Sequence, residues 1–188
     1  NKGAFDDPRV NVITDDAFSW VREGKGKAAA ETAAGGGKKY FDTVIVDLSD
    51  PDSDTMARLY SLEFYGMLRE LVDPQVGKLV VQSGSAFTTP DLFNRVRSTL
   101  RAAGCKNVLP YHVHVPTFGD WGFNLCAQPG EELKLPQQRP PLRFMDDAVL
   151  SAAGVFPKDN ALKELEPSTL DHPKIVEDLR RGYRQAGE

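Results

Sequence analysis

A short apolar run that ends in carboxylates constrains this chain more than any other stretch. Residues 43–46 are rich in β-branched side chains, a composition typical of a strand buried on both faces. Asp47 follows directly, Asp50 comes three residues later, and Pro51 prevents further regular pairing. Ligands of open α/β sheets bind at the carboxyl ends of the strands, so both acids are candidates for a general base and for holding a cationic substrate. The alternative is that they form only a turn and a helix cap.

Composition excludes several classes of protein. The 188 residues are enough for one domain with a substantial core, and a formal charge of −4 gives no basic excess of the kind that marks a nucleic-acid surface. No apolar run approaches the roughly 18 residues of a membrane span, and no signal peptide is visible, so we expect a cytoplasmic location. Cys105 and Cys126 lie outside any metal-type spacing. We expect them to be free thiols in a reducing cytosol.

The periodicity of apolar residues predicts alternating strands and helices. Strands are expected at residues 10–13, 43–46, 77–83, 107–115 and 123–127, and helices at 17–22, 64–71 and 90–103. The last two strands flank a tight loop and therefore form an antiparallel pair. This order is that of the closing half of a doubly wound α/β domain. The opening half, with a Gly-rich turn after its first strand and an acid after its second, is not present.

Two stretches within residues 1–128 resemble binding sites only weakly. Residues 24–39 are rich in Gly, Ala and Lys, and we interpret them as a flexible surface insertion with a frayed helical turn in its middle, since a phosphate loop would follow a strand and open a helix. His112 and His114 have the spacing of a metal-binding pair, but no third ligand lies near. We therefore predict two histidines on one face of a sheet and no metal site.

Residues 129–188 form a polar, Pro-rich tail. We interpret this tail as a C-terminal extension of the domain formed by residues 1–128. A short helix is expected around residues 146–153, and an amphipathic helix is expected after Pro173.

Five separated segments together resemble the polyamine aminopropyltransferases, the spermidine synthase family. They occur in the family's order and at its approximate spacing, across roughly residues 7–127. The segments are Asp16-Ala17 after the first strand, 41–51 (FDTVIVDLSDP), 59–65 (LYSLEFY), 80–84 (VVQSG) and 115–123 (VPTFGDWGF).

The resemblance implies a fold, a reaction and partners. The fold is a methyltransferase-like Rossmann sheet, and the protein is a homodimer. The reaction transfers an aminopropyl group from decarboxylated S-adenosylmethionine to putrescine or a related amine and releases methylthioadenosine, with no further cofactor. The partners are thus a small-molecule diamine and a nucleoside sulfonium donor. Some bacterial members carry membrane spans before the synthase domain, which leaves open an anchor in the bacterial inner membrane.

The resemblance also implies roles for individual residues. Asp16 would accept a hydrogen bond from the adenine amino group, with the backbone of Ala17 against the ring. Asp47 would remove a proton from the attacking amine, and Asp50 would help to hold the diamine. Gln82 would line the same cleft.

Departures from the family pattern are equally informative. Phe118 stands where the family commonly has Tyr, so a hydroxyl that would orient the amine is lost. Residues 52–55 are more acidic than the family's small-residue run. The Gly-rich turn and the acid that holds the donor's ribose would precede residue 10. We therefore expect this chain to be the carboxyl-terminal part of a longer protein, with an exposed edge on the strand at residues 43–46 and no turnover on its own.

Two alternatives remain at this point. The chain can be a non-catalytic module of the same fold that binds a polyamine or forms a dimer, which Phe118 favours. It can also be an S-adenosylmethionine-dependent methyltransferase. The acidic pair Asp47 and Asp50 favours a cationic acceptor and therefore argues against the methyltransferase alternative.

Overall fold

The computed structural model describes residues 3–33 and 39–187, apart from the side chain of Ala33. The helices are η1 (Ala4–Asp6), α1 (Ala17–Arg22), α2 (Lys25–Ala33), α3 (Asp54–Ala57), η2 (Arg58–Tyr60), α4 (Leu62–Arg69), α5 (Pro90–Ala102), α6 (Asp147–Ala153), η3 (Lys158–Asn160) and α7 (Ile175–Ala186). The strands are β1 (Thr43–Val46), β2 (Lys78–Gln82), β3 (Asn107–Val115) and β4 (Gly119–Ala127).

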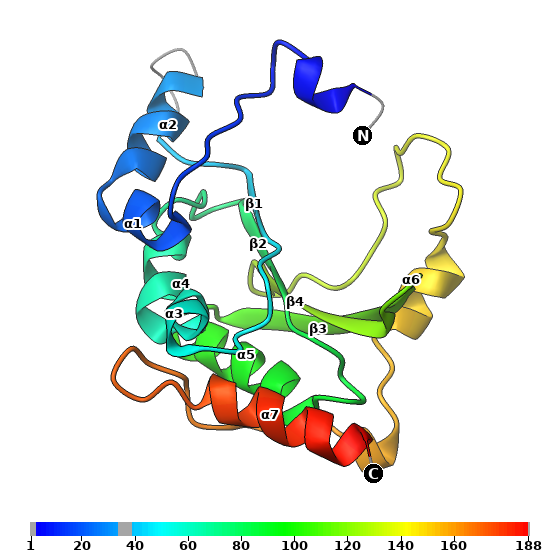
Figure 1. The fold of residues 1–188 in the computed structure, drawn as a ribbon. Helices are drawn as coiled ribbons and strands as arrows, with labels where there is room; N and C mark the ends of the chain where they lie inside the picture. The colour runs from blue at the N-terminus through cyan, green and yellow to red at the C-terminus, as the bar shows by residue number, and fades with distance from the viewer. Residues whose placement is uncertain (1–2, 34–38, 188) are drawn as a thin grey trace.

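The strands form one mixed sheet in the order β1-β2-β4-β3. β1 and β2 are parallel, whereas β4 is antiparallel to both of its neighbours. Helices α4 and α5 cover one side of the sheet, and α7 lies outside α5 (Figure 1). The predicted α/β class and the antiparallel closing pair are confirmed. β1 is an edge strand, as expected.

The core lies between the sheet and α4, α5 and α7. Leu79 and Val81 of β2 are almost fully buried against the apolar stripes of these helices. Each stripe repeats at helical spacing: Phe64 and Leu68 lie on α4, Leu92, Val96 and Leu100 on α5, and Ile175 and Leu179 on α7. Burial of these side chains therefore joins the C-terminal helix to the sheet domain through α5.

The backbone of the C-terminal tail also binds along α5. Asn94, Ser98 and Thr99 accept hydrogen bonds from the backbone N–H groups of Lys163, Leu165 and Ser168 at 2.9–3.0 Å. The expected helices around 146–153 and after Pro173 are present as α6 and α7. The boundary between residues 128 and 129 stays a prediction.

Three local expectations are wrong. Residues 10–13 form no strand, and Val12 and Ile13 are exposed, because apolar β-branched residues favour an extended chain but a strand also needs a partner. β1 is not buried on both faces, since the side chain of Ile45 is 72% exposed at the sheet edge. The insertion holds more than the expected frayed turn: residues Lys25–Ala33 form helix α2, whose alanines favour helix and whose Ala30 is buried. Residues 34–38 lie outside the described residues.

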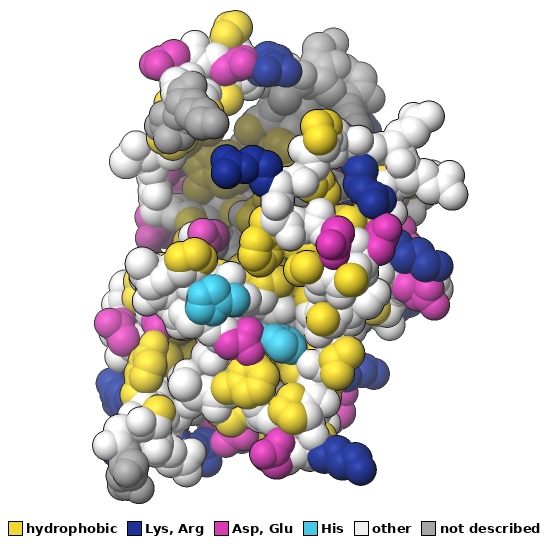
Figure 2. Space-filling view, turned by 90° about the vertical axis from the view of Figure 1, so that its right-hand side faces the viewer, with side chains coloured by type: hydrophobic (Ala, Val, Ile, Leu, Met, Phe, Trp, Pro, Cys, Tyr) yellow, Lys and Arg dark blue, Asp and Glu magenta, His cyan; other side chains and the backbone are white. Residues whose placement is uncertain are grey.

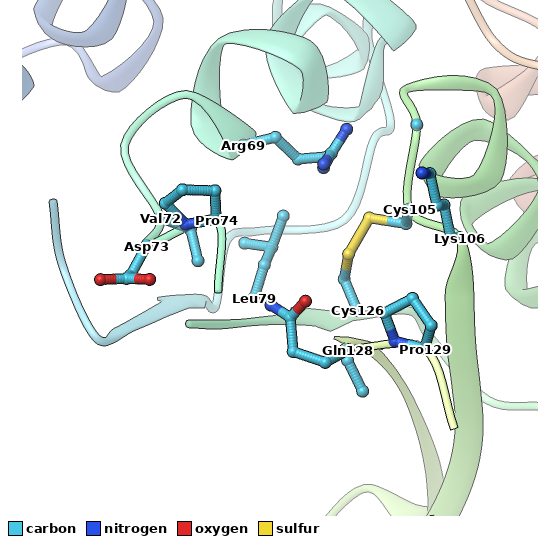
Figure 3. Close-up of a pocket in the computed structure, with 12 residues that line it drawn as sticks. Arg69, Val72, Asp73, Pro74, Leu79, Cys105, Lys106, Cys126, Gln128 and Pro129 are labelled. Atoms are coloured by element: carbon cyan, nitrogen blue, oxygen red, sulfur yellow. A yellow bond between two sulfur atoms is a disulfide. The ribbon is translucent and has the colours of Figure 1, made fainter. Parts of the chain in front are cut away.

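Cys105 and Cys126 form a disulfide, which corrects the expectation of free thiols. Cys105 follows α5 and Cys126 is near the end of β4, with 5.6 Å between the Cα atoms. The bond lines a cavity of about 330 Å³ together with Leu79 and Lys106 (Figure 3). The expectation rested on the usual redox state of the cytosol, which carries no information on how close two residues lie in the fold.

Replacing both cysteines with serine is expected to lower the free energy of unfolding by about 2–4 kcal/mol, because the bond closes a loop between residues 21 positions apart and restricts the unfolded chain. Urea unfolding with and without a reductant measures this loss. The double variant should not respond to the reductant. A wild-type chain equally insensitive to the reductant would contradict the prediction.

Candidate active site

The site is built at the carboxyl end of the parallel strand pair. Val46, the last residue of β1, pairs with Val81 of β2, so Asp47 and Gln82 follow at the same level of the sheet. Gln82 pairs in turn with Phe123 of β4. Because the β3–β4 turn precedes Phe123, it reaches the same edge. The topology thus gathers the predicted polar residues where ligands bind in α/β sheets.

These strand ends line a cavity of about 730 Å³. Four of the predicted site residues line it together: Asp47, Asp50, Gln82 and Phe118. None of the described residues in its wall is Lys, Arg or His. Two carboxylates in a cleft without a basic side chain give a negative potential, which attracts a cation.

The carboxylate of Asp50 is held by two donors from different parts of the chain. The amide nitrogen of Gln82 lies 3.3 Å from Oδ1, and the hydroxyl of Tyr183 on α7 donates to Oδ2 at 2.8 Å. The hydroxyl of Tyr60 lies 3.3 Å from the amide oxygen of Gln82 and 3.0 Å from the carbonyl oxygen of Ser49. Tyr60, Gln82 and Asp50 therefore form a polar chain that fixes the orientation of the carboxylate.

Asp47 differs from Asp50 in its surroundings. Its side chain is exposed and has no hydrogen-bond or ion-pair partner among the residues that the structure describes. Burial raises the pKa of the Tyr60 phenol, and the charges of Asp50 and then Asp47 raise it further. Tyr60 therefore stays protonated and serves as a donor. Because Asp47 has no partner among the described residues, its oxygens are available to a donor on a bound ligand.

The turn between β3 and β4 contributes an aromatic wall under backbone strain. Thr117 has a φ of 80°, a left-handed conformation that a β-branched residue rarely adopts. It is followed by Phe118, whose ring centroid lies 5.4 Å from that of Trp121. All three residues line the cavity. Strain of this kind persists where the surrounding structure enforces it and is commonly found at ligand sites.

Asp16 and Ala17 do not line this cavity. Asp16 caps α1: its Oδ1 accepts the Ser19 N–H at 2.8 Å, and its Oδ2 pairs with Arg58 at 2.5 Å. The hydrogen bond from the Ser19 backbone is the largest influence on the pKa of Asp16 and lowers it. The carboxylate thus remains ionised as an acceptor, and the predicted contact with an adenine ring stays a prediction.

His112 and His114 lie on the β3–β4 pair, away from the cavity wall. The two ring nitrogens of His112 lie 2.9 Å from Asp120 Oδ1 and 2.8 Å from the carbonyl oxygen of Val155. On this side of the molecule imidazole rings lie against an acidic side chain, with hydrophobic side chains nearby (Figure 2). No group of three or more His, Cys, Asp or Glu side chains in the described parts of the chain could hold a metal ion.

Comparison with protein families matches residues 1–135 to the model of the spermine/spermidine synthase domain. The chain belongs to the spermine/spermidine synthase family. A polyamine aminopropyltransferase of Corynebacterium efficiens is 61% identical across the whole of this chain, and one of Mycobacterium tuberculosis is 50% identical across 97% of it. The chain spans about a third of the length of these curated relatives, 34% and 33% respectively.

Solved structures of the family share the fold. A spermidine synthase in complex with the transition-state analogue AdoDATO superposes with a TM-score of 0.62 at 17% identity, covering 84% of this chain and 49% of that one. The spermidine synthase of Thermotoga maritima superposes with a TM-score of 0.60 at 20% identity, covering 84% and 50%. The predicted methyltransferase-like fold is confirmed. No helix in the described parts of the chain is both long and apolar enough to cross a bilayer.

Two tyrosines that contact the polar side chains of the cleft, Tyr60 behind its wall and Tyr183 in it, were not predicted from the sequence. Tyr60 lies within the segment 59–65 that resembles the family, but nothing in the local sequence distinguishes a tyrosine that donates to a cleft residue from one that only fills the core. Tyr183 lies outside residues 1–135, which match the spermine/spermidine synthase domain. No local pattern connects Tyr183 with Asp50, which is 133 residues away in sequence.

Proposed function

We propose that the protein carrying this chain transfers an aminopropyl group from decarboxylated S-adenosylmethionine to a diamine such as putrescine. The observation that supports this most directly is the acidic cleft, where Asp47 and Asp50 lie in a wall without a described basic side chain. Membership of the family supports the reaction class.

The residues of the cleft fit the chemical requirements of this reaction. A protonated amine has no lone pair, so the attacking nitrogen must lose a proton, and the free carboxylate of Asp47 accepts it. The nitrogen then forms a bond to the aminopropyl carbon next to the sulfonium. The carbon–sulfur bond breaks, sulfur keeps the electron pair, and methylthioadenosine leaves. Since the sulfonium already activates the carbon, the protein contributes mainly by orientation and electrostatics.

In this proposal, Asp50 and the aromatic wall bind the diamine. The carboxylate of Asp50, oriented by Gln82, attracts the second ammonium group of the diamine. The methylene chain packs against Phe118, and aromatic faces also attract ammonium groups. Asp16 and Ala17 would bind the adenine of the donor, at the start of α1. A homodimer stays part of the proposal and is checked by the molar mass in solution.

The experiment uses the full-length protein that carries this chain. Incubation with decarboxylated S-adenosylmethionine and putrescine is expected to release methylthioadenosine in a ratio of one to one with spermidine. The donor without amine is the control. Absence of product with putrescine, cadaverine and spermidine would contradict the enzymatic proposal and leave the non-catalytic amine-binding module. Methyl transfer from S-adenosylmethionine to any of these amines would instead support the methyltransferase alternative.

A further inference from the structure

The C-terminal helix α7 reaches into the acidic cleft. The hydroxyl of Tyr183 donates to Asp50 Oδ2 at 2.8 Å, and Ala186 lines the same cavity one turn later. Asp50 is thereby held between Gln82 at the end of β2 and Tyr183 on α7. Tyr183 is 51% exposed, so its hydroxyl lies at the mouth of the cleft rather than in the core.

The position of Tyr183 is set by close packing of the preceding residue. A Cβ atom at Gly182 would lie 2.7 Å from the carbonyl oxygen of Thr88 and 2.9 Å from Thr89 Cα. Only glycine permits this approach of α7 to the segment before α5. On the same helix, Asp178 is buried in an ion pair with Arg95. The helix therefore has little freedom to slide or rotate, and Tyr183 points at Asp50 before any ligand arrives.

Of the two described residues of α7 that line the cleft, Tyr183 is polar and Ala186 is apolar. Burial, the hydrogen bond to Asp50 and the charge of that carboxylate together raise the pKa of Tyr183 to about 12. The phenol therefore remains a donor at neutral pH. Phe118 on the β3–β4 turn lines the same cavity and has no hydroxyl of its own.

We propose that Tyr183 is a positioning residue of the amine site, which fixes Asp50 so that this carboxylate receives the distal ammonium group of the diamine. The proposal rests on the aminopropyltransferase function proposed above. Oδ2 is held by Tyr183 and Oδ1 by the longer contact with Gln82, so each oxygen of this cleft-lining carboxylate keeps acceptor capacity for a further donor. The C-terminal helix, beyond the residues that match the family domain, thus takes part in amine recognition.

A purely structural role is the competing explanation, in which the hydrogen bond only fastens α7 to the loop after β1. The two roles differ in what they do when Asp50 is changed. A residue that acts through the charge of Asp50 has no effect on KM for the amine once that charge is gone, whereas a structural fastening keeps its effect, because the amide oxygen of Asp50→Asn still accepts from the Tyr183 hydroxyl. They also differ in the substrate affected, because positioning of Asp50 concerns the amine and not the donor.

The test is a double-mutant cycle in the full-length protein, with Tyr183→Phe, Asp50→Asn and the double variant. Tyr183→Phe is expected to raise KM for putrescine about 10-fold, because it removes a hydrogen bond to a charged group. KM for decarboxylated S-adenosylmethionine should stay unchanged. In the Asp50→Asn background the same substitution should change KM for putrescine by less than about 2-fold. Tyr40→Phe, which removes a hydroxyl from a separate surface cavity, is the matched control.

Equal effects of Tyr183→Phe in both backgrounds, or no effect on KM for putrescine, would overturn the proposal. Failure of the proposed function is visible separately, as a wild-type protein that releases no methylthioadenosine. In that case the same four proteins are titrated with putrescine in a calorimeter. About 10-fold weaker binding by Tyr183→Phe alone would support the positioning role, whereas unchanged binding, or no binding even by the wild type, would refute it.

Discussion

Asp47→Asn in the full-length protein is expected to lower kcat by about 10²–10⁴-fold, the range over which a positioned general base contributes. The amide has nearly the shape of the carboxylate but cannot accept the proton of the attacking amine. Asp47 has no partner among the described residues, so the substitution breaks no hydrogen bond of the fold. Initial rates of methylthioadenosine release at saturating donor and putrescine measure the effect.

Asp52→Asn is the matched control for this prediction. It removes the same charge from the same loop, but Asp52 is exposed and does not line the cavity. We expect its kcat to stay within about 2-fold of the wild type, because screening by solvent weakens a surface charge. An Asp47→Asn enzyme with the kcat of the wild type would show that another group takes the proton.

The half of the site formed by strand ends was predictable from sequence. Asp47 and Gln82 each follow an apolar run, and parallel strands bring their carboxyl ends to one edge. The apolar pattern of the two strands therefore predicted that Asp47 and Gln82 lie close together, although it gave no distance between them. Phe118 was predicted only from the resemblance of residues 115–123 to the family, and the structure places all three in one cavity.

The other half of the site depends on contacts between residues far apart in sequence, which no local pattern predicts. Tyr183 meets Asp50 because α7 packs on α5, and that packing follows from Gly182 and from side chains distant in sequence. The disulfide between Cys105 and Cys126 has the same origin, since the end of α5 and the end of β4 meet only in the folded chain. Residues 10–13 show the converse: their pattern favours a strand, but they pair with none of the strands in the described parts of the chain.

Asp178→Asn is expected to destabilise the domain by about 3–5 kcal/mol, the cost of breaking a buried ion pair. Asp178 is 1% exposed and Arg95 is 8% exposed. Arg95 binds Asp178 through Nε and through Nη2, the latter at 3.1 Å, and Arg181 adds a contact at 2.7 Å. The amide would leave the Arg95 guanidinium buried without a counter-charge, and its second nitrogen–carboxylate bond would be lost.

Glu177→Gln is the control that separates the loss of the buried ion pair from the mere loss of a negative charge on α7. Glu177 precedes Asp178 on the same helix and is exposed, so the same acid-to-amide change should alter the free energy of unfolding by less than about 0.5–1 kcal/mol. Urea unfolding followed by circular dichroism compares the two variants. Because α7 carries Tyr183, Asp178→Asn should also raise KM for putrescine. A loss of stability no larger than that of Glu177→Gln would mean that water reaches the Arg95–Asp178 pair and that α7 is held mainly by its apolar face.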